Sequence, residues 1–243
     1  MSISSKYYQV PVQSSSEPEF GGIVISESCE RLVQLVETSW LAVSPAYFER
    51  GFQHAKSAVY VRTGVAMKLK QAAERLPDGI KLLAWDGVRS LQLQAEIADR
   101  FRLDLAKKGL SAAEKKRLVT QFVSPLPSSF AEFHHTPPAH TTGGAIDLTL
   151  CDGTGKPLDM GTEFDDFSEK SRPDWYERNG TIDDEKPRVL RRLLTNIMNT
   201  VGGVQYHTEW WHFEFGTIRA CAYKGHNVAP YGPIVPADGI GRL

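Results

Sequence analysis

The sequence has little cysteine, no excess of charge of either sign and no long apolar run. Its three cysteines, Cys29, Cys151 and Cys221, are widely spaced, and none belongs to a CxxC pair. This pattern excludes a framework of disulfide bonds and a zinc site built from thiolates, and it is typical of a reducing compartment.

Charge and hydropathy also limit the possible partners. The formal net charge is −1, so no broad basic field attracts nucleic acid or an anionic membrane surface. No segment approaches the ~18 consecutive apolar residues of a membrane span. The first twenty residues, MSISSKYYQVPVQSSSEPEF, lack the apolar centre of a secretory signal. We therefore expect a cytoplasmic protein with neither nucleic-acid nor membrane partners; the oligomeric state stays open.

The chain is long enough for one large domain. It has 243 residues, of which 41% are hydrophobic, which suffices for a sizeable core. Residues 1–20 are rich in Ser, Pro and Gln and predict a flexible, loosely attached N-terminal arm. Because no repeat or long linker interrupts the remainder, residues 21–243 are expected to form a single domain.

Periodic apolar residues and capping signals predict the helices. Apolar side chains recur at helical spacing in residues 64–76 and 187–201. Ser90 is a candidate N-cap for a helix that extends to about residue 108. The segment SAAE, which begins at Ser111, matches a capping box at the start of a shorter helix.

Short apolar segments predict strands at residues 80–85, 145–150, 204–207 and 211–215. In the second of them, alternation places Asp147 opposite the apolar side chains, on the open face of a sheet. Helices before and between strands, with a hairpin near the C-terminus, favour an α+β fold in which helices pack on an antiparallel sheet.

Two motifs carry the chemistry. In HTTGGAID, His140 and Asp147 lie seven positions apart across a pair of glycines; in EWWH, His212 follows Glu209 by three positions. Two imidazoles and one carboxylate are the ligands of many catalytic zinc sites, where a fourth position is left for water. A further glutamate that is not a ligand suits a general base. The motifs together predict metal-assisted hydrolysis.

Simpler interpretations exist for each motif. His140 could be a loop histidine bonded to the backbone, and Asp147 could cap a turn. The spacing of Glu209 and His212 does not suit one face of a regular strand, so both reach a metal only if a bulge or bend lies between them. Otherwise Glu209 is a solvated charge and His212 alone binds the metal.

Taken together, the motifs resemble the VanX-type D-alanyl-D-alanine dipeptidases, which are zinc peptidases related to D,D-carboxypeptidases and to the Hedgehog signalling domain. The signature of that family is SxHxxGxAxD followed by ExWH, and this chain has PAHTTGGAID and EWWH. WDGVRS, DLTL and LDMGTEFDDF are also similar, so the resemblance spans residues 80–215.

The resemblance implies a Hedgehog/D,D-peptidase-like fold and a zinc peptidase domain over residues 21–243. It implies one zinc ion per chain, bound by His140, Asp147 and His212, with Glu209 as the catalytic base. The implied reaction is hydrolysis of D-alanyl-D-alanine or a similar small D,D-dipeptide. The alternatives are a D,D-carboxypeptidase or endopeptidase that acts on peptidoglycan, and a non-catalytic zinc-binding interaction module.

Further roles follow from the same resemblance. Arg89, in WDGVRS, matches the arginine that stabilises the transition state; its alternative is a salt bridge to Asp86 or Glu96. Asp165, in FDDF, matches an aspartate suited to the ammonium group of the substrate, and a loop-capping role is the alternative.

The chain departs from the family pattern at two positions. Pro138 stands where the family has serine, which removes one expected hydrogen bond; Thr141 or Thr142 is expected to replace it, and Thr141 is our choice for substrate binding. Ser90 stands where the family usually has proline. Trp211, in EWWH, is expected to keep water from the site and to contact the substrate.

Overall fold

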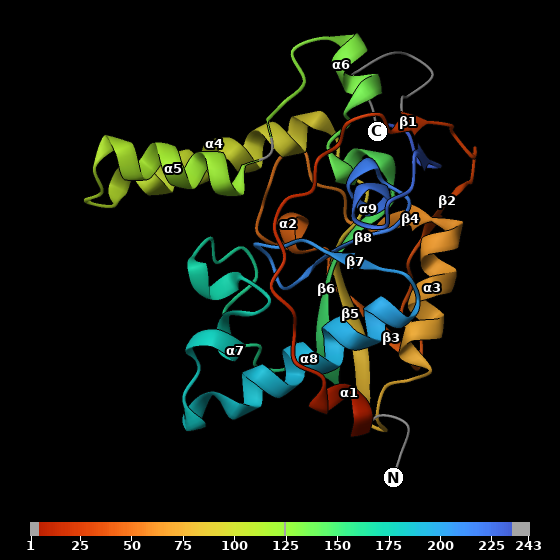
Figure 1. Ribbon diagram of the computed structural model, residues 1–243, viewed down its shortest axis with the longest axis vertical. Coiled ribbons are helices and arrows are strands. Elements are labelled where there is room, and N and C mark those ends of the chain that lie inside the picture. The colour runs from red at the N-terminus through yellow and green to blue at the C-terminus, as the bar shows by residue number, and fades with distance from the viewer. Residues whose placement is uncertain (1–4, 124, 235–243) are drawn as a thin grey trace.

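A computed structural model describes residues 5–123 and 125–234 of the chain (Figure 1). Positions 1–4, 124 and 235–243, which belong to the expected arm and domain, lie outside the described residues. Helices surround a central sheet, and one large hydrophobic core lies between them (Figure 1). No helix of the described part of the chain is long and apolar enough to cross a membrane.

The central sheet has five strands in the order β3–β5–β6–β8–β7. Their bounds are β3 (Leu41–Val43), β5 (Ile80–Asp86), β6 (Ala145–Asp152), β8 (His212–Glu214) and β7 (Val204–Gln205). All neighbouring pairs are antiparallel except β3 and β5, which are parallel. The predicted α+β fold with an antiparallel sheet is confirmed, and the parallel pair comes from a strand that the sequence did not predict.

Two further sheets have two strands each. They are formed by β1 (Val24–Ile25) with β9 (Val228–Ala229) and by β2 (Leu32–Gln34) with β4 (Tyr60–Arg62). The remaining short helices are α2 (Ala46–Glu49), α6 (Phe130–His135), α7 (Trp175–Asn179), α9 (Ile218–Tyr223), and the 3₁₀ turns η1 (Ala139–Thr142), η2 (Glu169–Ser171) and η3 (Ile182–Asp184).

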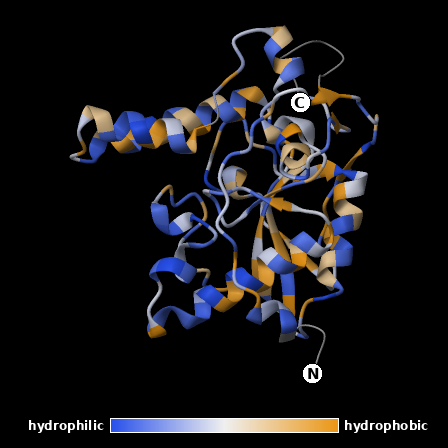
Figure 2. Ribbon diagram, in the orientation of Figure 1, coloured by the Kyte–Doolittle hydropathy of each residue, from blue (hydrophilic) through white to orange (hydrophobic). Residues whose placement is uncertain are grey.

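Three helices cover the sheet on one side. Helices α1 (Ser5–Gln9) and α3 (Thr63–Ala73) pack on α8 (Glu185–Thr200), and α3 and α8 also contact β5 and β6. Both long helices were predicted from apolar spacing. Hydrophobic and hydrophilic residues alternate along α8 in Figure 2. Its Leu193 and Ile197 are fully buried, as expected for an amphipathic helix against a core.

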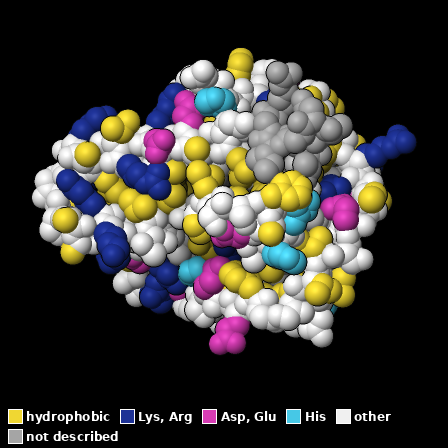
Figure 3. Space-filling model, turned by 90° about the horizontal axis from the view of Figure 1, so that it is seen from above, with side chains coloured by type: hydrophobic (Ala, Val, Ile, Leu, Met, Phe, Trp, Pro, Cys, Tyr) yellow, Lys and Arg dark blue, Asp and Glu magenta, His cyan; other side chains and the backbone are white. Residues whose placement is uncertain are grey.

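Helices α4 (Leu91–Lys107) and α5 (Ala112–Phe122) form a hairpin that projects from the body of the protein (Figure 1). Ser90 caps α4 by accepting a hydrogen bond from the backbone N–H of Leu93, and Ser111 forms the predicted capping box with Glu114. The hairpin has a small hydrophobic cluster of its own, separate from the main core. Lysine and arginine side chains gather on this projection, at the left of Figure 3.

The N-terminal segment differs from the loose arm that we expected. Within residues 5–20, Tyr7 and Val12 are each 6% exposed. The side-chain amide of Asn196, on α8, donates to the carbonyls of Tyr7 and Val10 at 3.0 and 2.8 Å. The composition of this segment did not indicate the attachment, because only two buried side chains hold a segment that is otherwise polar. That residues 21–243 form a single domain stays a prediction.

Candidate active site

Three neighbouring strands each contribute one polar side chain to a single row. Asp147 of β6 pairs with Asp86 of β5 on one side and with His212 of β8 on the other. Directly opposed residues of antiparallel strands point to the same face of a sheet. An irregularity in β5 lets the register skip Trp85, so that Asp86 lies beside Asp147.

This face of the sheet is covered, whereas we expected it to be open. Asp147 is only 2% exposed, and Thr149, which points the same way, is fully buried. The sequence could not show this because distant segments cover the face: Tyr47, Arg89 and Trp211 line the same pocket as Asp147. The carboxylate therefore lies in a largely desolvated pocket.

His140 joins the row from the turn η1, directly before β6. Gly143 ends this turn with φ at 71°, a conformation that glycine adopts without strain. A Cβ atom there would lie 2.8 Å from the side chain of Leu32. The glycine that the motif places between His140 and Asp147 thus permits the close turn that brings the two side chains together.

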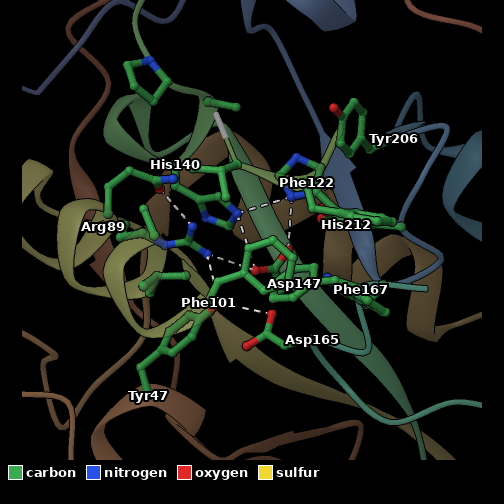
Figure 4. Close-up of a pocket in the computed structure, with 18 of the residues that line it drawn as sticks. Tyr47, Arg89, Phe101, Phe122, His140, Asp147, Asp165, Phe167, Tyr206 and His212 are labelled. Carbon is green, nitrogen blue, oxygen red and sulfur yellow. Dashed lines mark hydrogen bonds and ion pairs between the residues drawn. The ribbon is translucent and has the colours of Figure 1, made fainter. Parts of the chain in front are cut away.

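The three side chains converge on one point (Figure 4). Nε2 of His140 lies 3.1 Å from Nδ1 of His212 and 3.3 Å from Oδ2 of Asp147. Nδ1 of His212 lies 2.9 Å from Oδ1 of Asp147. Tetrahedral ligands at about 2.0–2.1 Å from an ion lie about 3.3 Å from one another. The donor types and their spacing therefore fit a divalent ion such as zinc.

The far nitrogen of each imidazole is held by a second group. Nδ1 of His140 lies 2.7 Å from the carbonyl of Gly87, and Nε2 of His212 lies 3.0 Å from Oε1 of Glu214. Such partners fix the tautomer and the orientation of a metal-binding histidine. We did not predict a role for Glu214 from the sequence. The signal was available, because residues two apart on a strand share a face.

Protonation opposes metal binding at this cluster. Burial lowers the pKa of His212, but its hydrogen bonds to Asp147 and Glu214 outweigh that effect and raise the pKa to about 10. Burial also disfavours the charged form of Asp147, yet His140 and His212 hold its pKa well below the usual range. A cation bound here must displace the proton between His212 and Asp147, so metal binding releases a proton.

Replacing Glu214 by glutamine is expected to weaken zinc binding about tenfold, because a neutral amide supports His212 less well than a carboxylate does. Titration of the metal-free protein with zinc against a chromophoric chelator would measure the affinity. Glu74→Gln, an exposed position directly after α3, is the matched control. Equal affinity in the two variants would show that Glu214 does not support the ligand.

Glu209 reaches the same pocket through the bend that its spacing required. The backbone N–H of His212 donates to the carbonyl of Glu209 at 3.4 Å, which closes a turn directly before β8. The side chain of Glu209 is half-buried and lines the pocket, unlike a solvated surface charge. Burial, together with the charges of Asp147 and Asp165, raises the pKa of Glu209 to about 7. That value suits a group that both accepts and donates protons near neutral pH.

Arg89 forms the salt bridge that we considered as its alternative role, and it also lines the pocket. It forms a salt bridge with Asp86, in which its Nε lies 2.9 Å from Oδ2. Its Nη1 donates to Gln94 at 2.8 Å and its Nη2 to Asp147 at 3.2 Å. Its side chain lines the pocket at the same time. Glu96 contacts other partners, so only the Asp86 alternative is found.

Asp165 lies in the pocket, where two groups fix its carboxylate. Oδ1 accepts from the hydroxyl of Tyr47 at 3.1 Å, and Oδ2 accepts from Nη1 of Arg50 at 2.8 Å. Its φ of 62° is unusual for a residue other than glycine. Burial raises the pKa of Asp165 to about 6. Tyr47 and Tyr206 also line the pocket, and no spacing in the sequence indicated these two tyrosines.

The geometry supports the role predicted for Trp211 better than the role predicted for Thr141. Trp211 lines the pocket and is 1% exposed, in agreement with a role in excluding water. The hydroxyl of Thr141 donates to the carbonyl of Pro138 at 2.7 Å, and that of Thr142 to the carbonyl of Ala139 at 2.6 Å. Both hydroxyls therefore stabilise the turn, and the geometry does not support Thr141 as a substrate contact.

An apolar wall closes the pocket on the side of the projecting hairpin. Phe101 of α4 and Phe122 of α5 line the pocket, together with Phe167 (Figure 4). The ring of Phe167 lies 4.6 Å from that of Phe101 and 5.5 Å from that of Phe122. We did not predict this wall, because the apolar face of α4 indicated only a core. It gives the site a boundary that excludes water.

Comparison with known proteins identifies the family of this chain. Residues 53–224 match the model of a peptidase family described as D-ala-D-ala dipeptidase, peptidase M15. A D-alanyl-D-alanine dipeptidase of Synechocystis sp. is 30% identical over 224 residues, which cover 86% of each chain. One of Enterococcus faecalis is 30% identical over 62% of this chain and 70% of its own.

Among solved structures, a vancomycin resistance D,D-pentapeptidase VanY in complex with Zn(II) aligns with 90% of this chain and 96% of its own. The TM-score is 0.41 and the sequence identity is 15%. The assignment rests on the sequence matches, since the family model covers most of the chain. This protein belongs to the D-ala-D-ala dipeptidase family of M15 peptidases.

Proposed function

We propose that this protein hydrolyses D-alanyl-D-alanine, or a closely similar small D,D-dipeptide, with the aid of one zinc ion. The observation that carries the proposal is the convergence of His140, Asp147 and His212 on one point. Glu209 and Arg89 line the same pocket. Membership of the D-ala-D-ala dipeptidase family supports the choice of substrate.

His140, Asp147 and His212 would hold the zinc ion. The two imidazoles are already oriented by Gly87 and Glu214, so little rearrangement is needed on binding. Bound zinc lowers the pKa of a coordinated water from ~15.7 toward ~7 and polarises the peptide carbonyl. Two imidazoles and a carboxylate leave a position for that chemistry, whereas a purely structural site is usually closed by four protein ligands.

Glu209 would move the protons. Its carboxylate accepts a proton from the attacking water and then delivers that proton to the leaving amine. Because its pKa lies at about 7, neither transfer is strongly uphill. Arg89, anchored by Asp86 and Gln94, would stabilise the negative charge that develops on the carbonyl oxygen. Such a contribution is worth about 3–4 kcal/mol for one donor in comparable sites.

The pocket supports a small substrate. The Asp165 carboxylate would bind the ammonium group of the dipeptide, in a position fixed by Tyr47 and Arg50. Phe101, Phe122 and Phe167 also line the pocket and limit its space. An ammonium contact inside a bounded pocket favours a free dipeptide over the end of a longer peptide.

Incubation of the zinc-loaded protein with D-Ala-D-Ala, with L-Ala-L-Ala and with a wall pentapeptide that ends in D-Ala-D-Ala would test the proposal. We expect only D-Ala-D-Ala to be cleaved, which chromatography of the released alanine would detect. Cleavage of the pentapeptide alone would indicate a D,D-carboxypeptidase. Stoichiometric zinc without cleavage of any peptide would indicate a non-catalytic zinc-binding module.

The cytoplasmic location, and the expectation of neither nucleic-acid nor membrane partners, stay predictions from composition. Fractionation of cells that express the protein at its natural level would test the location. Enrichment in the membrane or extracellular fraction would contradict it.

A further inference from the structure

We propose that Arg219 binds the C-terminal carboxylate of the dipeptide, so that the site recognises both ends of its substrate. This inference rests on the proposed function and adds a substrate-binding residue that the sequence motifs do not contain. Arg219 lies on α9 and lines the same pocket as His212 and Glu209.

A free dipeptide carries a carboxylate that needs a cationic or hydrogen-bonding partner once it leaves water. Among the described residues that line the pocket, the basic side chains with a permanent charge are Arg89 and Arg219. Each arginine contacts two carboxylates, but all three guanidinium nitrogens of Arg89 have a partner, whereas Nη2 of Arg219 has none among the described residues. Arg219 is therefore the better candidate.

Contacts on two sides hold the guanidinium of Arg219 in place. Its Nε donates to Glu17 at 3.0 Å and its Nη1 donates to Glu214. Its Nη2 has no hydrogen-bond partner among the described residues. The group lies 4.3 Å from the centre of the Tyr206 ring, a stacking geometry that stabilises arginine. A donor fixed in this way loses little entropy on binding a ligand.

The two acidic neighbours of Arg219 also have other hydrogen-bond donors. Glu214 also accepts hydrogen bonds from His212 and Thr217, and Glu17 also contacts His207. Neither carboxylate contacts Nη2 of Arg219. The arginine keeps the capacity to bind another carboxylate through its second terminal nitrogen.

The position where the family has serine supplies no donor to the part of the pocket next to Arg219. Pro138 lines both this pocket and the adjoining one, as Arg219 does, and proline has no backbone N–H. The hydroxyls of Thr141 and Thr142 are engaged within their own turn. A carboxylate that lies here would therefore pair with Arg219, because the residue at the serine position cannot donate.

The position also suits the order of the charged groups along the substrate. In Figure 4, Asp165 and Tyr206 lie on opposite sides of the cluster formed by His140, Asp147 and His212. Arg219 stacks on Tyr206. A dipeptide with its ammonium at Asp165 and its carboxylate at Arg219 would therefore place its peptide bond at the cluster, between the two ends.

The test compares D-Ala-D-Ala with D-alanyl-D-alaninamide, which lacks the carboxylate. Calorimetric binding of both to the zinc-loaded Glu209→Gln protein needs no turnover, so it is independent of the hydrolysis assay. We expect the free acid to bind on the order of 10- to 100-fold more tightly than the amide. Arg219→Gln in that background is expected to reduce the preference to about threefold or less.

Zinc content is measured for each variant, because Arg219 also contacts Glu214. Glu17→Gln is the matched control: it alters a partner of Arg219 but leaves the Nη2 donor, so the preference for the free acid should persist. Should Arg219→Gln not fold, Arg219→Lys replaces it, since an ammonium can pair with Glu214 but cannot present a second nitrogen to the substrate. An unchanged preference in the folded Arg219 variant, or no preference in the parent, would overturn the inference.

The experiments distinguish a failure of this inference from a failure of the proposed function. If the protein binds the free acid through Arg219 but hydrolyses no dipeptide, the result would support the carboxylate-binding site and contradict the proposed reaction. If the protein hydrolyses D-Ala-D-Ala but Arg219→Gln leaves the acid-to-amide preference unchanged, the result would support the proposed function and contradict the role of Arg219.

Discussion

Replacing Glu209 by alanine or glutamine is expected to abolish nearly all hydrolysis of D-Ala-D-Ala while zinc stays bound. The three ligand side chains are untouched by the change, so the metal content should stay near one ion per chain. The loss follows from removal of the group that moves both protons, and general acid–base catalysis contributes about 10²- to 10⁴-fold. The kcat and the zinc content of the same preparation measure the two effects.

Glu209→Gln is the sharper of the two variants, because glutamine keeps the shape of the side chain and removes only its basicity. Glu19→Gln, an exposed position on the N-terminal segment, serves as control for the loss of one negative charge. Turnover within a few fold of the parent enzyme in Glu209→Gln would assign the base to another residue.

Replacing His212 by alanine is expected to remove zinc and activity together. The site would keep only His140 and Asp147, and two protein ligands hold zinc far more weakly than three. The change also leaves the buried carboxylates of Asp147 and Glu214 without the imidazole between them, which costs stability. Zinc content after dialysis, the rate of hydrolysis and the thermal midpoint report these three effects.

His135→Ala is the matched control, because His135 lies exposed on α6 and does not belong to the ligand cluster. It should keep both zinc and activity. Full zinc occupancy in His212→Ala would contradict ligation by that residue, whatever its activity.

Local signals were sufficient to predict the elements that depend on neighbouring residues. The serine caps of α4 and α5 and the apolar spacing of α3 and α8 could be read directly, because helix ends and faces are determined within a few positions. The ligand cluster was also predictable. Its residues lie in two short motifs, and the glycine between His140 and Asp147 indicated a close turn.

Features that depend on distant segments were not predictable. The attachment of Tyr7 to α8, the parallel pairing of β3 and the cover over Asp147 arise from packing between residues far apart in the chain. The Phe101–Phe122–Phe167 wall likewise has no sequence signature of its own. Apolar periodicity shows that a face is buried, but it does not show what lies against that face.

The alignment of β6 with β8 links metal binding to correct folding. Asp147 and His212 are neighbours only in the observed register, and a slip by one residue would turn every side chain of β8 to the opposite face. Occupancy of the site thus reports whether these strands have aligned correctly. A misregistered chain would lack a cofactor as well as hydrogen bonds, and the ion would favour the aligned form by mass action.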